Sequence, residues 1–186
     1  SYRCIIEGNN ISDVAGTSNG QGIDTHGGVD FRIYGNTIEN CEVGIVVTAS
    51  SISGAQTLGP KRCVVIGNTI KYSEAGGGVG YGIMVSGAHN DGTPVEYAEG
   101  IVVTGNIIIG HGITNDYLTG GIVAQFTLGC TIQGNNVRRS RCNGICMNLY
   151  NYGFNVSGNT IEDPHDNTYV SPACIGVVGS YNWGFI

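Results

Sequence analysis

Short runs of alternating apolar and polar residues recur along the chain, and each run ends at a Gly-Asn pair. The run Phe31–Tyr34 leads into Gly35-Asn36, and the run Ile101–Thr104 leads into Gly105-Asn106. Alternation with a period of two places successive side chains on opposite faces of a β-strand. The pattern therefore predicts short strands joined by tight turns, with Gly-Asn pairs at positions 8–9, 35–36, 67–68, 105–106, 134–135 and 158–159.

A second motif, a strand that opens with Gly-Ile or a close variant, recurs beside the first. It starts at Gly22, Gly44, Gly82, Gly121 and Gly144, and a fainter copy starts at Gly176. Units of strand and turn that repeat at intervals of about 20 residues or more indicate a solenoid. We therefore predict an all-β parallel β-helix with loop insertions, in which residues 1–186 form a single domain that is a piece of a longer protein.

In this register, equivalent residues of successive coils stack in columns. One column of inward apolar side chains is expected at Ile23, Ile45, Ile83, Ile122 and Ile145, and a second at Ile33, Val65, Val103, Ile132 and Val156. The asparagines of the Gly-Asn pairs form a third column, in which each amide can hydrogen-bond to neighbouring coils and satisfy buried turn backbone. These columns are structural, and we expect no catalytic role for them.

The cysteines, seven in all, follow the same repeat. Three of them alternate with larger apolar residues in an inward column, about 9.6 Å apart, which is too far for a disulfide. We interpret these three, Cys4, Cys63 and Cys130, as buried free thiols. Cys142 and Cys174 precede strands of adjacent coils, where they either pair or remain free.

Composition narrows the range of partners. Charged residues are few, 32 residues are glycine, and the formal net charge of −6 argues against a nucleic-acid groove. No apolar run is long enough to insert into a membrane. An acidic surface still permits an acidic glycan held locally by Lys and Arg. No cofactor and no metal are expected.

One Gly-Ile strand differs from the others, because it carries Asp24 and His26 two residues apart. Both should face outward, while Thr25 faces inward. An Asp beside a His can orient the imidazole for proton transfer, so the pair can act as acid and base. The alternatives are an exposed hydrogen bond without chemistry, and two metal ligands that lack a clear third.

The outward positions of the following coils complete this face. They form an apolar stripe beside a polar row, which suits a sugar chain lying along the helix axis. Gln125 and Asn148 of the polar row are candidates for binding sugar hydroxyls. The stripe comprises Val46, Met84, Val123 and Cys146, and the row comprises Thr48, Ser86, Gln125 and Asn148.

The repeated Gly-Asn-Thr-Ile turns and the asparagine column resemble the right-handed parallel β-helix superfamily, pectate-lyase-like in the broad sense. This resemblance covers essentially the whole chain and implies a right-handed coil. Asp24-Thr25-His26 is similar to the Asp-Pro-His strand of mannuronan C5-epimerases and related alginate lyases, which implies proton-transfer roles for Asp24 and His26. That family's catalytic Tyr, three residues before its Asp, is replaced here by Gln21, which we group with the substrate-binding residues.

The strands also resemble those of phage tailspikes and neck appendages, which degrade capsule, lipopolysaccharide or teichoic acid. This resemblance implies a virion or extracellular location, with a homotrimer as one candidate assembly. Such enzymes act on acidic or cell-wall glycans, and Lys61 and Arg62 are candidates for binding an acidic sugar or phosphate. Asp30 lies close to Asp24 in the coil and is a further candidate for substrate binding.

Three other features leave alternatives open. A glycosidase needs a second carboxylate. The candidates, most of which are better interpreted as solvated loop charges, are Asp30, Glu42, Asp91, Glu96 and Glu99. The insertions at 49–62 and 87–100, the latter with His89, are expected to stand beside the groove as walls. The late aromatic residues can stack on sugars or pack against loops: Tyr150, Tyr152, Tyr181 and Trp183.

Two functional hypotheses follow. The first is an enzyme that degrades or modifies an acidic cell-surface polymer, with Asp24 and His26 as acid and base. The second is a structural or receptor-binding β-helix without catalysis.

Overall fold

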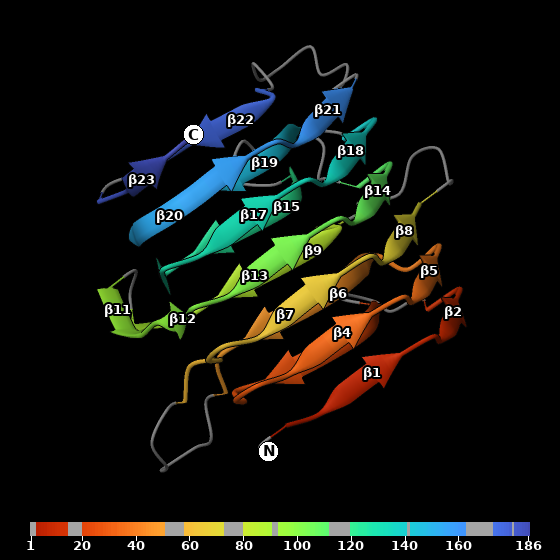
Figure 1. Ribbon diagram of the computed structural model, residues 1–186, viewed down its shortest axis with the longest axis horizontal. Helices are drawn as coiled ribbons and strands as arrows, with labels where there is room; N and C mark the ends of the chain where they lie inside the picture. The colour runs from red at the N-terminus through yellow and green to blue at the C-terminus, as the bar shows by residue number, and fades with distance from the viewer. Residues whose placement is uncertain are drawn as a thin grey trace.

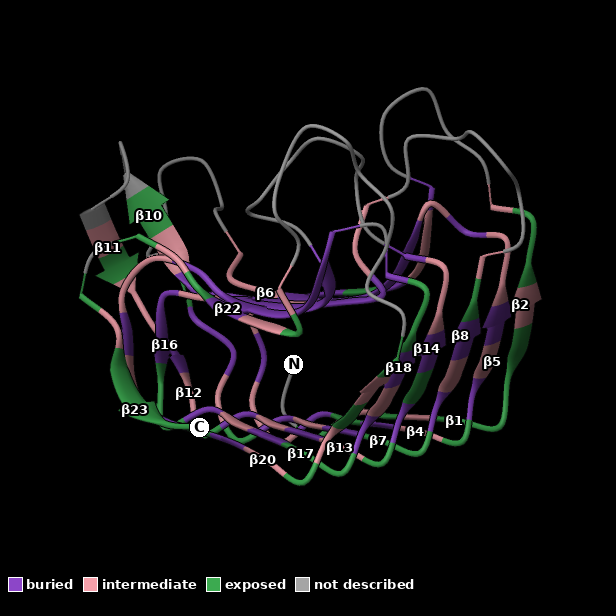
Figure 2. Cartoon of the chain, turned by 90° about the horizontal axis from the view of Figure 1, so that it is seen from above, coloured by how far each residue is buried: buried purple, intermediate pink, exposed green. Residues whose placement is uncertain are grey.

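The computed structural model describes residues 3–14, 20–50, 58–72, 80–90, 93–111, 120–140, 142–162, 173–179 and 181–186. Within these ranges the chain winds as a parallel β-helix, as the repeats predicted, with the right hand that the resemblance implied (Figure 1). Its coils stack from the N-terminal to the C-terminal end. Equivalent strands of successive coils pair in parallel and form three main sheets that enclose the core (Figure 2).

The sheets follow one another in each coil. Sheet A contains β1 (Ile5–Glu7), β4 (Arg32–Tyr34), β7 (Val64–Ile66), β13 (Val102–Thr104), β17 (Thr131–Gln133) and β20 (Asn151–Ser157). Sheet B follows the Gly-Asn turn and contains β2 (Asn10–Ser12), β5 (Thr37–Glu39), β8 (Thr69–Lys71), β14 (Ile107–Ile109), β18 (Asn136–Arg138) and β21 (Thr160–Glu162). Sheet C holds the Gly-Ile strands β3 (Gln21–His26), β6 (Val43–Thr48), β9 (Ile83–Ser86), β15 (Gly120–Gln125), β19 (Asn143–Met147) and β22 (Ile175–Val177).

A short fourth side, which the repeat pattern did not predict, joins sheet C back to sheet A. It consists of β12 (Ala98–Glu99) and β16 (Thr127–Leu128), which pair with each other, and β16 also pairs with the first residues of β20. The last strand, β23 (Trp183–Phe185), pairs with β20. A hairpin of β10 (Ala88–Asn90) and β11 (Thr93–Glu96) projects from the coil beside this side (Figure 2).

The asparagine column forms the continuous hydrogen-bond ladder that the sequence predicted. Asn68 is fully buried, and its Oδ1 accepts hydrogen bonds from the backbone N and from Nδ2 of Asn36, at 3.0 and 2.9 Å. Its own Nδ2 donates to Asn106 Oδ1 at 3.0 Å and to the carbonyl oxygen of Ile33 at 3.0 Å. The same pattern runs from Asn9 to Asn159, so the turns between sheets A and B have their buried polar groups satisfied.

The glycines that open the sheet C strands lie where the chain has no room for a side chain. A Cβ on Gly44 would lie 2.4 Å from the carbonyl oxygen of Gly82 and 2.5 Å from Cγ2 of Ile70 on sheet B. A Cβ on the equivalent glycines would likewise lie against a carbonyl oxygen of the next coil and an apolar side chain of sheet B; these are Gly22, Gly82, Gly121 and Gly144. These glycines therefore allow sheet C to approach sheet B closely, which explains the first residue of the repeated motif.

Both predicted apolar columns are confirmed by the strand register. Ile23 aligns with Ile45 and Ile33 with Val65, and the isoleucines and valines of both columns are buried. The last coil is a correction: Ile175, and not Val177, aligns with Ile145, so Gly176 lies opposite Cys146. The fainter motif had been aligned on its glycine, whereas the register follows the inward isoleucine.

Cys63 and Cys130 are buried free thiols, as the column predicted. Cys4 is also a free thiol but is only half-buried, in contrast to the expectation. Burial raises the pKa of the Cys130 thiol to about 12. Cys142 is buried, Cys174 is exposed, and no disulfide joins them.

Candidate functional site

Asp24 and His26 meet on β3, at the N-terminal edge of sheet C. The alternation holds, because Ile23 and Thr25 are buried while Asp24 and His26 are exposed on the outer face. His26 Nε2 lies 2.8 Å from Asp24 Oδ2, and their side chains are 58% and 29% exposed. An ionised carboxylate can only accept, so Nε2 carries the proton in this contact. Nδ1 is then the ring atom available for proton exchange.

The insertion after β6 begins and ends beside this pair. Ser50 and Leu58 pair in antiparallel fashion through two backbone hydrogen bonds, of 3.0 and 3.3 Å. Both residues contact Gly27, the residue that follows His26, where an added Cβ would lie 2.6 Å from the carbonyl oxygen of Leu58. The described ends of this insertion therefore stand next to His26, as expected of a wall, and residues 51–57 lie outside the described residues.

The predicted polar row continues from His26 across sheet C. Thr48 aligns with both His26 and Ser86, and Ser86 aligns with Gln125. Gln125 Nε2 donates to Ser86 Oγ at 3.1 Å, and Asn148 Nδ2 donates to Gln125 Oε1 at 3.2 Å. Asn148 is only 5% exposed, and its Oδ1 has no hydrogen-bond partner among the described residues. The two predicted sugar-binding amides thus contact each other.

The apolar stripe beside this row differs from the expectation of an open surface. Val46 is 5% exposed, Val123 1% and Cys146 0%. Strand alternation decides only which way a side chain points out of the sheet. It cannot show whether other parts of the chain cover that face. Met84, the remaining member of the stripe, is half-buried, and Asp24 and His26 are exposed at the N-terminal end of the face.

The other predicted binding residues lie away from that pair. Asp30 receives two hydrogen bonds from Arg62, from Nε at 2.8 Å and from Nη2 at 3.1 Å, at the edge of sheet A. This guanidinium lowers the pKa of Asp30, and the carboxylate raises that of Arg62. Lys61 Nζ contacts Glu99 at 3.0 Å and Glu96 at 3.1 Å, and these carboxylates raise its pKa. Asp24 lies on β3 of sheet C, whereas Asp30 precedes β4 of sheet A and is engaged there by Arg62.

The remaining candidates have structural contacts. Gln21 is half-buried at the start of β3. Glu42 Oε2 accepts a hydrogen bond from the backbone N of Gly20 at 3.1 Å, and Glu96 and Glu99 hold Lys61. His89 of the β10–β11 hairpin stacks on Phe126 with ring centroids 4.7 Å apart, and Asp91 lies outside the described residues.

The late aromatic residues pack largely on each other. The rings of Phe126, Tyr150 and Tyr181 form a stack, with centroid separations of 5.8 and 4.9 Å. Tyr152 meets Tyr97 edge to face at 5.9 Å. These contacts favour the packing alternative for Tyr150 and Tyr152, whereas Tyr181 is 58% and Trp183 70% exposed.

No group of three His, Cys, Asp or Glu side chains that could hold a metal ion occurs among the described residues. The same residues contain no helix of the length and hydrophobicity needed to cross a membrane.

Comparison with known proteins identifies the architecture. No protein-family model matches the chain, and no curated protein matches it in sequence. The crystal structure of alginate lyase from Paenibacillus sp. str. FPU-7 matches over 98% of this chain and 70% of that chain, with 15% identity and a TM-score of 0.54. The A-module of Azotobacter vinelandii mannuronan C-5 epimerase AlgE4 matches over 100% of this chain and 56% of that chain, with 14% identity and a TM-score of 0.38. The alginate lyase match establishes the parallel β-helix fold and no more.

Proposed function

We propose that this domain modifies an acidic glycan, with Asp24 and His26 as its proton-transfer pair. The observation that carries the proposal is the 2.8 Å contact between Asp24 and His26 on the outer face of a β-helix sheet. The other members of the row are neutral, namely Thr48, Ser86, Gln125 and Asn148. A charged pair at the open end of a neutral row is where a polymer chain could meet an acid or base.

In this proposal, Asp24 and His26 have different roles. Asp24 holds the Nε2–H of the ring and stabilises the imidazolium that forms when Nδ1 takes a proton. The imidazole, with more than half of its surface exposed, is the member that a bound sugar can reach. Removal of the proton beside a sugar carboxylate would begin elimination or epimerisation, whereas protonation of the glycosidic oxygen would begin hydrolysis. The amide of Gln21 cannot serve as an acid or base for any of these reactions.

The substrate class follows from two similarities. The alginate lyase that shares the fold acts, by its name, on an acidic polysaccharide, and the Asp-X-His strand resembles that of enzymes acting on such polymers. We extend the proposal to a cell-surface polysaccharide or teichoic acid and to a phage tail, appendage or secreted protein. A homotrimer is the assembly we propose for a virion protein.

The second candidate is a receptor-binding or structural β-helix without turnover. The burial of Val46, Val123 and Cys146 favours it, because the face beyond His26 offers little open apolar surface for sugar rings. On this hypothesis, the Asp24–His26 contact stabilises the exposed edge of sheet C and transfers no proton.

Product analysis separates the two candidates. The protein would be incubated with alginate, other acidic bacterial polysaccharides and teichoic acids, and the products analysed by mass spectrometry and by NMR for epimerisation. Asp24→Asn and His26→Gln should each lower turnover by about 100-fold or more, while Glu39→Gln, which removes a carboxylate from sheet B, should not. Equal turnover by Asp24→Asn and the unsubstituted protein would exclude the proton-transfer role. Absence of products from polymers that bind would favour the second candidate.

A further inference from the structure

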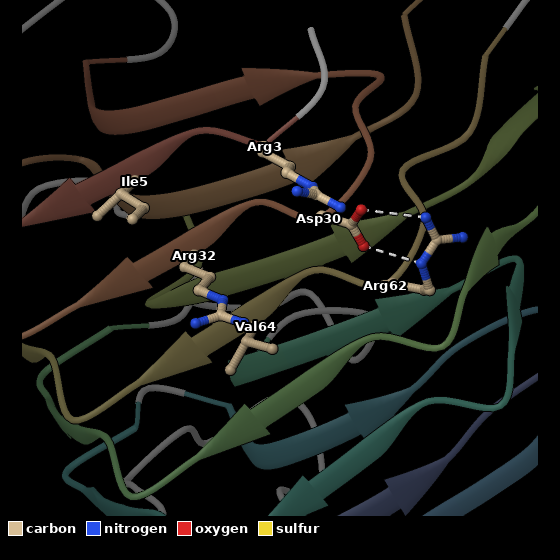
Figure 3. A pocket seen from close by; sticks show the side chains of 6 residues that line it. All are labelled: Arg3, Ile5, Asp30, Arg32, Arg62 and Val64. Atoms are coloured by element: carbon tan, nitrogen blue, oxygen red, sulfur yellow. Dashed lines mark hydrogen bonds and ion pairs between the residues drawn. The ribbon is translucent and has the colours of Figure 1, made fainter.

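A pocket on the outer face of sheet A gathers much of the chain's positive charge. It has a volume of about 500 Å³ and lies on the first coils (Figure 3). Three of the eight basic residues of an acidic chain meet here around one carboxylate. The lining residues are Arg3, Ile5, Asp30, Arg32, Arg62 and Val64.

The backbone brings these charges together in two adjacent columns. Arg3, Asp30 and Arg62 occupy equivalent positions of successive coils, and all three have left-handed φ angles, of 59, 60 and 53°. In the next coils the same column contains Gly100, Gly129 and Gly153, which also have left-handed φ angles. Glycine is the residue that this backbone conformation favours, so the first three coils have charged residues where glycine would be expected. Coils are about 4.8 Å apart, which places Asp30 between the two arginines. Arg32 follows two residues later in the same coil.

The charges in the pocket are only partly neutralised. Asp30 is engaged by both Nε and Nη2 of Arg62 (Figure 3). Arg3 and Arg32 are exposed, and neither guanidinium has a hydrogen bond or ion pair with another described residue. Two guanidinium groups therefore remain available to an anion, and guanidinium groups bind carboxylates with matched paired hydrogen bonds.

Apolar surface adjoins these cations. Ile5 is 60% exposed and aligns with Arg32, which in turn aligns with Val64. A neighbouring pocket of about 330 Å³ extends the same face along Arg32 and Val64 to Tyr34 and Ile66. A surface of this kind can pack against the C–H face of a sugar ring while the arginines hold its acidic group.

We propose that this pocket is a non-catalytic subsite for a carboxylate-bearing sugar polymer, which it holds through Arg3 and Arg32. It lies across the core from Asp24 and His26, and thus forms a second point of attachment. The choice of ligand rests on the proposed function, because it is the same class of acidic glycan. A polymer bound here would keep its other segments at high local concentration around the protein.

Titration calorimetry at low ionic strength tests the subsite, with a hexameric oligo-uronate as probe. Arg3→Gln and Arg32→Gln should each weaken binding by about tenfold, and the double variant by about 100-fold. Arg139→Gln is the matched control, because Arg139 is also exposed with a left-handed φ of 50°, but at a different corner of the coil. Affinity should fall as salt is added.

Asp30→Asn gives a prediction of opposite sign. Asparagine tolerates the left-handed backbone at this position, and the substitution removes the carboxylate that repels the ligand and engages Arg62. Binding should therefore become tighter, by about fivefold. A surface with a merely structural role would show weaker binding or no change.

Several outcomes would overturn the subsite. They are undiminished binding by the double variant, equal binding of a neutral hexasaccharide, or no binding of the oligo-uronate at all. Inorganic phosphate that binds as tightly as the oligomer would refute a sugar ligand, and tighter binding of a glycerol-phosphate oligomer would refute the carboxylate. Asp24→Asn should bind the probe normally, so loss of turnover in that variant and loss of binding in the arginine variants report separately on the two sites.

Discussion

The asparagine ladder allows one prediction to be worked out from individual contacts. Asn68→Ala removes five side-chain hydrogen bonds from a fully buried site: two accepted from Asn36 and three donated, to Asn106, Ile33 and, at the longest distance of 3.3 Å, Ile66. It also leaves the backbone N–H of Asn36 without that acceptor. A buried hydrogen bond contributes about 1 kcal/mol net, and a buried group left unsatisfied costs about 1–3 kcal/mol. Since Asn36 Nδ2 retains carbonyl acceptors on Ile6 and Tyr34, we expect a total loss of about 4 kcal/mol.

The same substitution at the end of the ladder should cost far less. Asn9 is exposed and donates through Nδ2 to the carbonyl oxygen of Glu7 and to Asn36 Oδ1, at 3.1 and 2.9 Å. Water can replace both contacts, and Asn36 Oδ1 still accepts from the backbone N of Asn9 at 3.0 Å. We expect Asn9→Ala to lower the free energy of unfolding by about 1 kcal/mol or less.

Urea unfolding followed by far-UV circular dichroism measures the difference, with variants compared at equal m value. Gln133→Ala is the internal control, because Gln133 is an exposed amide on β17 in the middle of the stack. Its loss should be below about 0.5 kcal/mol. A difference between the Asn68 and Asn9 variants below about 1 kcal/mol would refute the argument that burial, and not the amide itself, makes the ladder stabilising.

Three further predictions concern packing, thiols and pH. Gly44→Ala should lower the free energy of unfolding by about 3 kcal/mol, because the new Cβ has no space; a neutral effect in urea titration would contradict the close approach of sheets B and C. A thiol reagent at pH 8 should label Cys174 in the folded protein and Cys130 only after unfolding, because Cys130 is buried with a raised pKa; rapid labelling of Cys130, seen by peptide mass mapping, would disprove this. The pKa of Asp30 in the folded protein lies below its unfolded value of about 3.9. The contribution of Asp30 to the free energy of unfolding is therefore complete above the unfolded pKa and is lost as the pH falls through the folded pKa. Acid unfolding curves of Asp30→Asn should lack this pH-dependent loss.

Much of the fold could be predicted because each coil repeats the same constraints. The Gly-Asn pairs predicted the asparagine ladder, and the inward isoleucines and valines predicted the register of sheets A and C. The fourth side was missed because β12 and β16 have two residues each, too few to show alternation. The sequence alignment of the last coil was wrong because Gly176 was matched to the first glycine of the Gly-Ile motif. In the structure, Cys174 is the residue equivalent to that glycine, Gly144.

The candidate site was predicted where strand alternation or the repeat specifies which residues are neighbours. Asp24 and His26 lie on one strand, and the repeat aligns Thr48, Ser86 and Gln125 with His26. The partners of Lys61 and Arg62 come from other coils, and their ion pairs depend on side-chain conformations that no local pattern specifies. The sequence analysis did not identify Arg3 and Arg32 as binding residues. The sequence does contain a signal for this cluster: Arg3, Asp30 and Arg62 each directly precede a member of the predicted inward column that begins at Cys4.

The ladder also determines how the molecule should respond to mechanical load. The side-chain amide hydrogen bonds of the ladder and the backbone hydrogen bonds between parallel strands run along the axis of the stack. The two ends of the described chain lie at opposite ends of that stack (Figure 1). Because each coil contacts only its neighbours, the junctions carry axial tension in series, and an end coil, which has a neighbour on one side only, should detach first. Extension should therefore proceed as a series of small steps, in which coils detach one after another from an end of the stack.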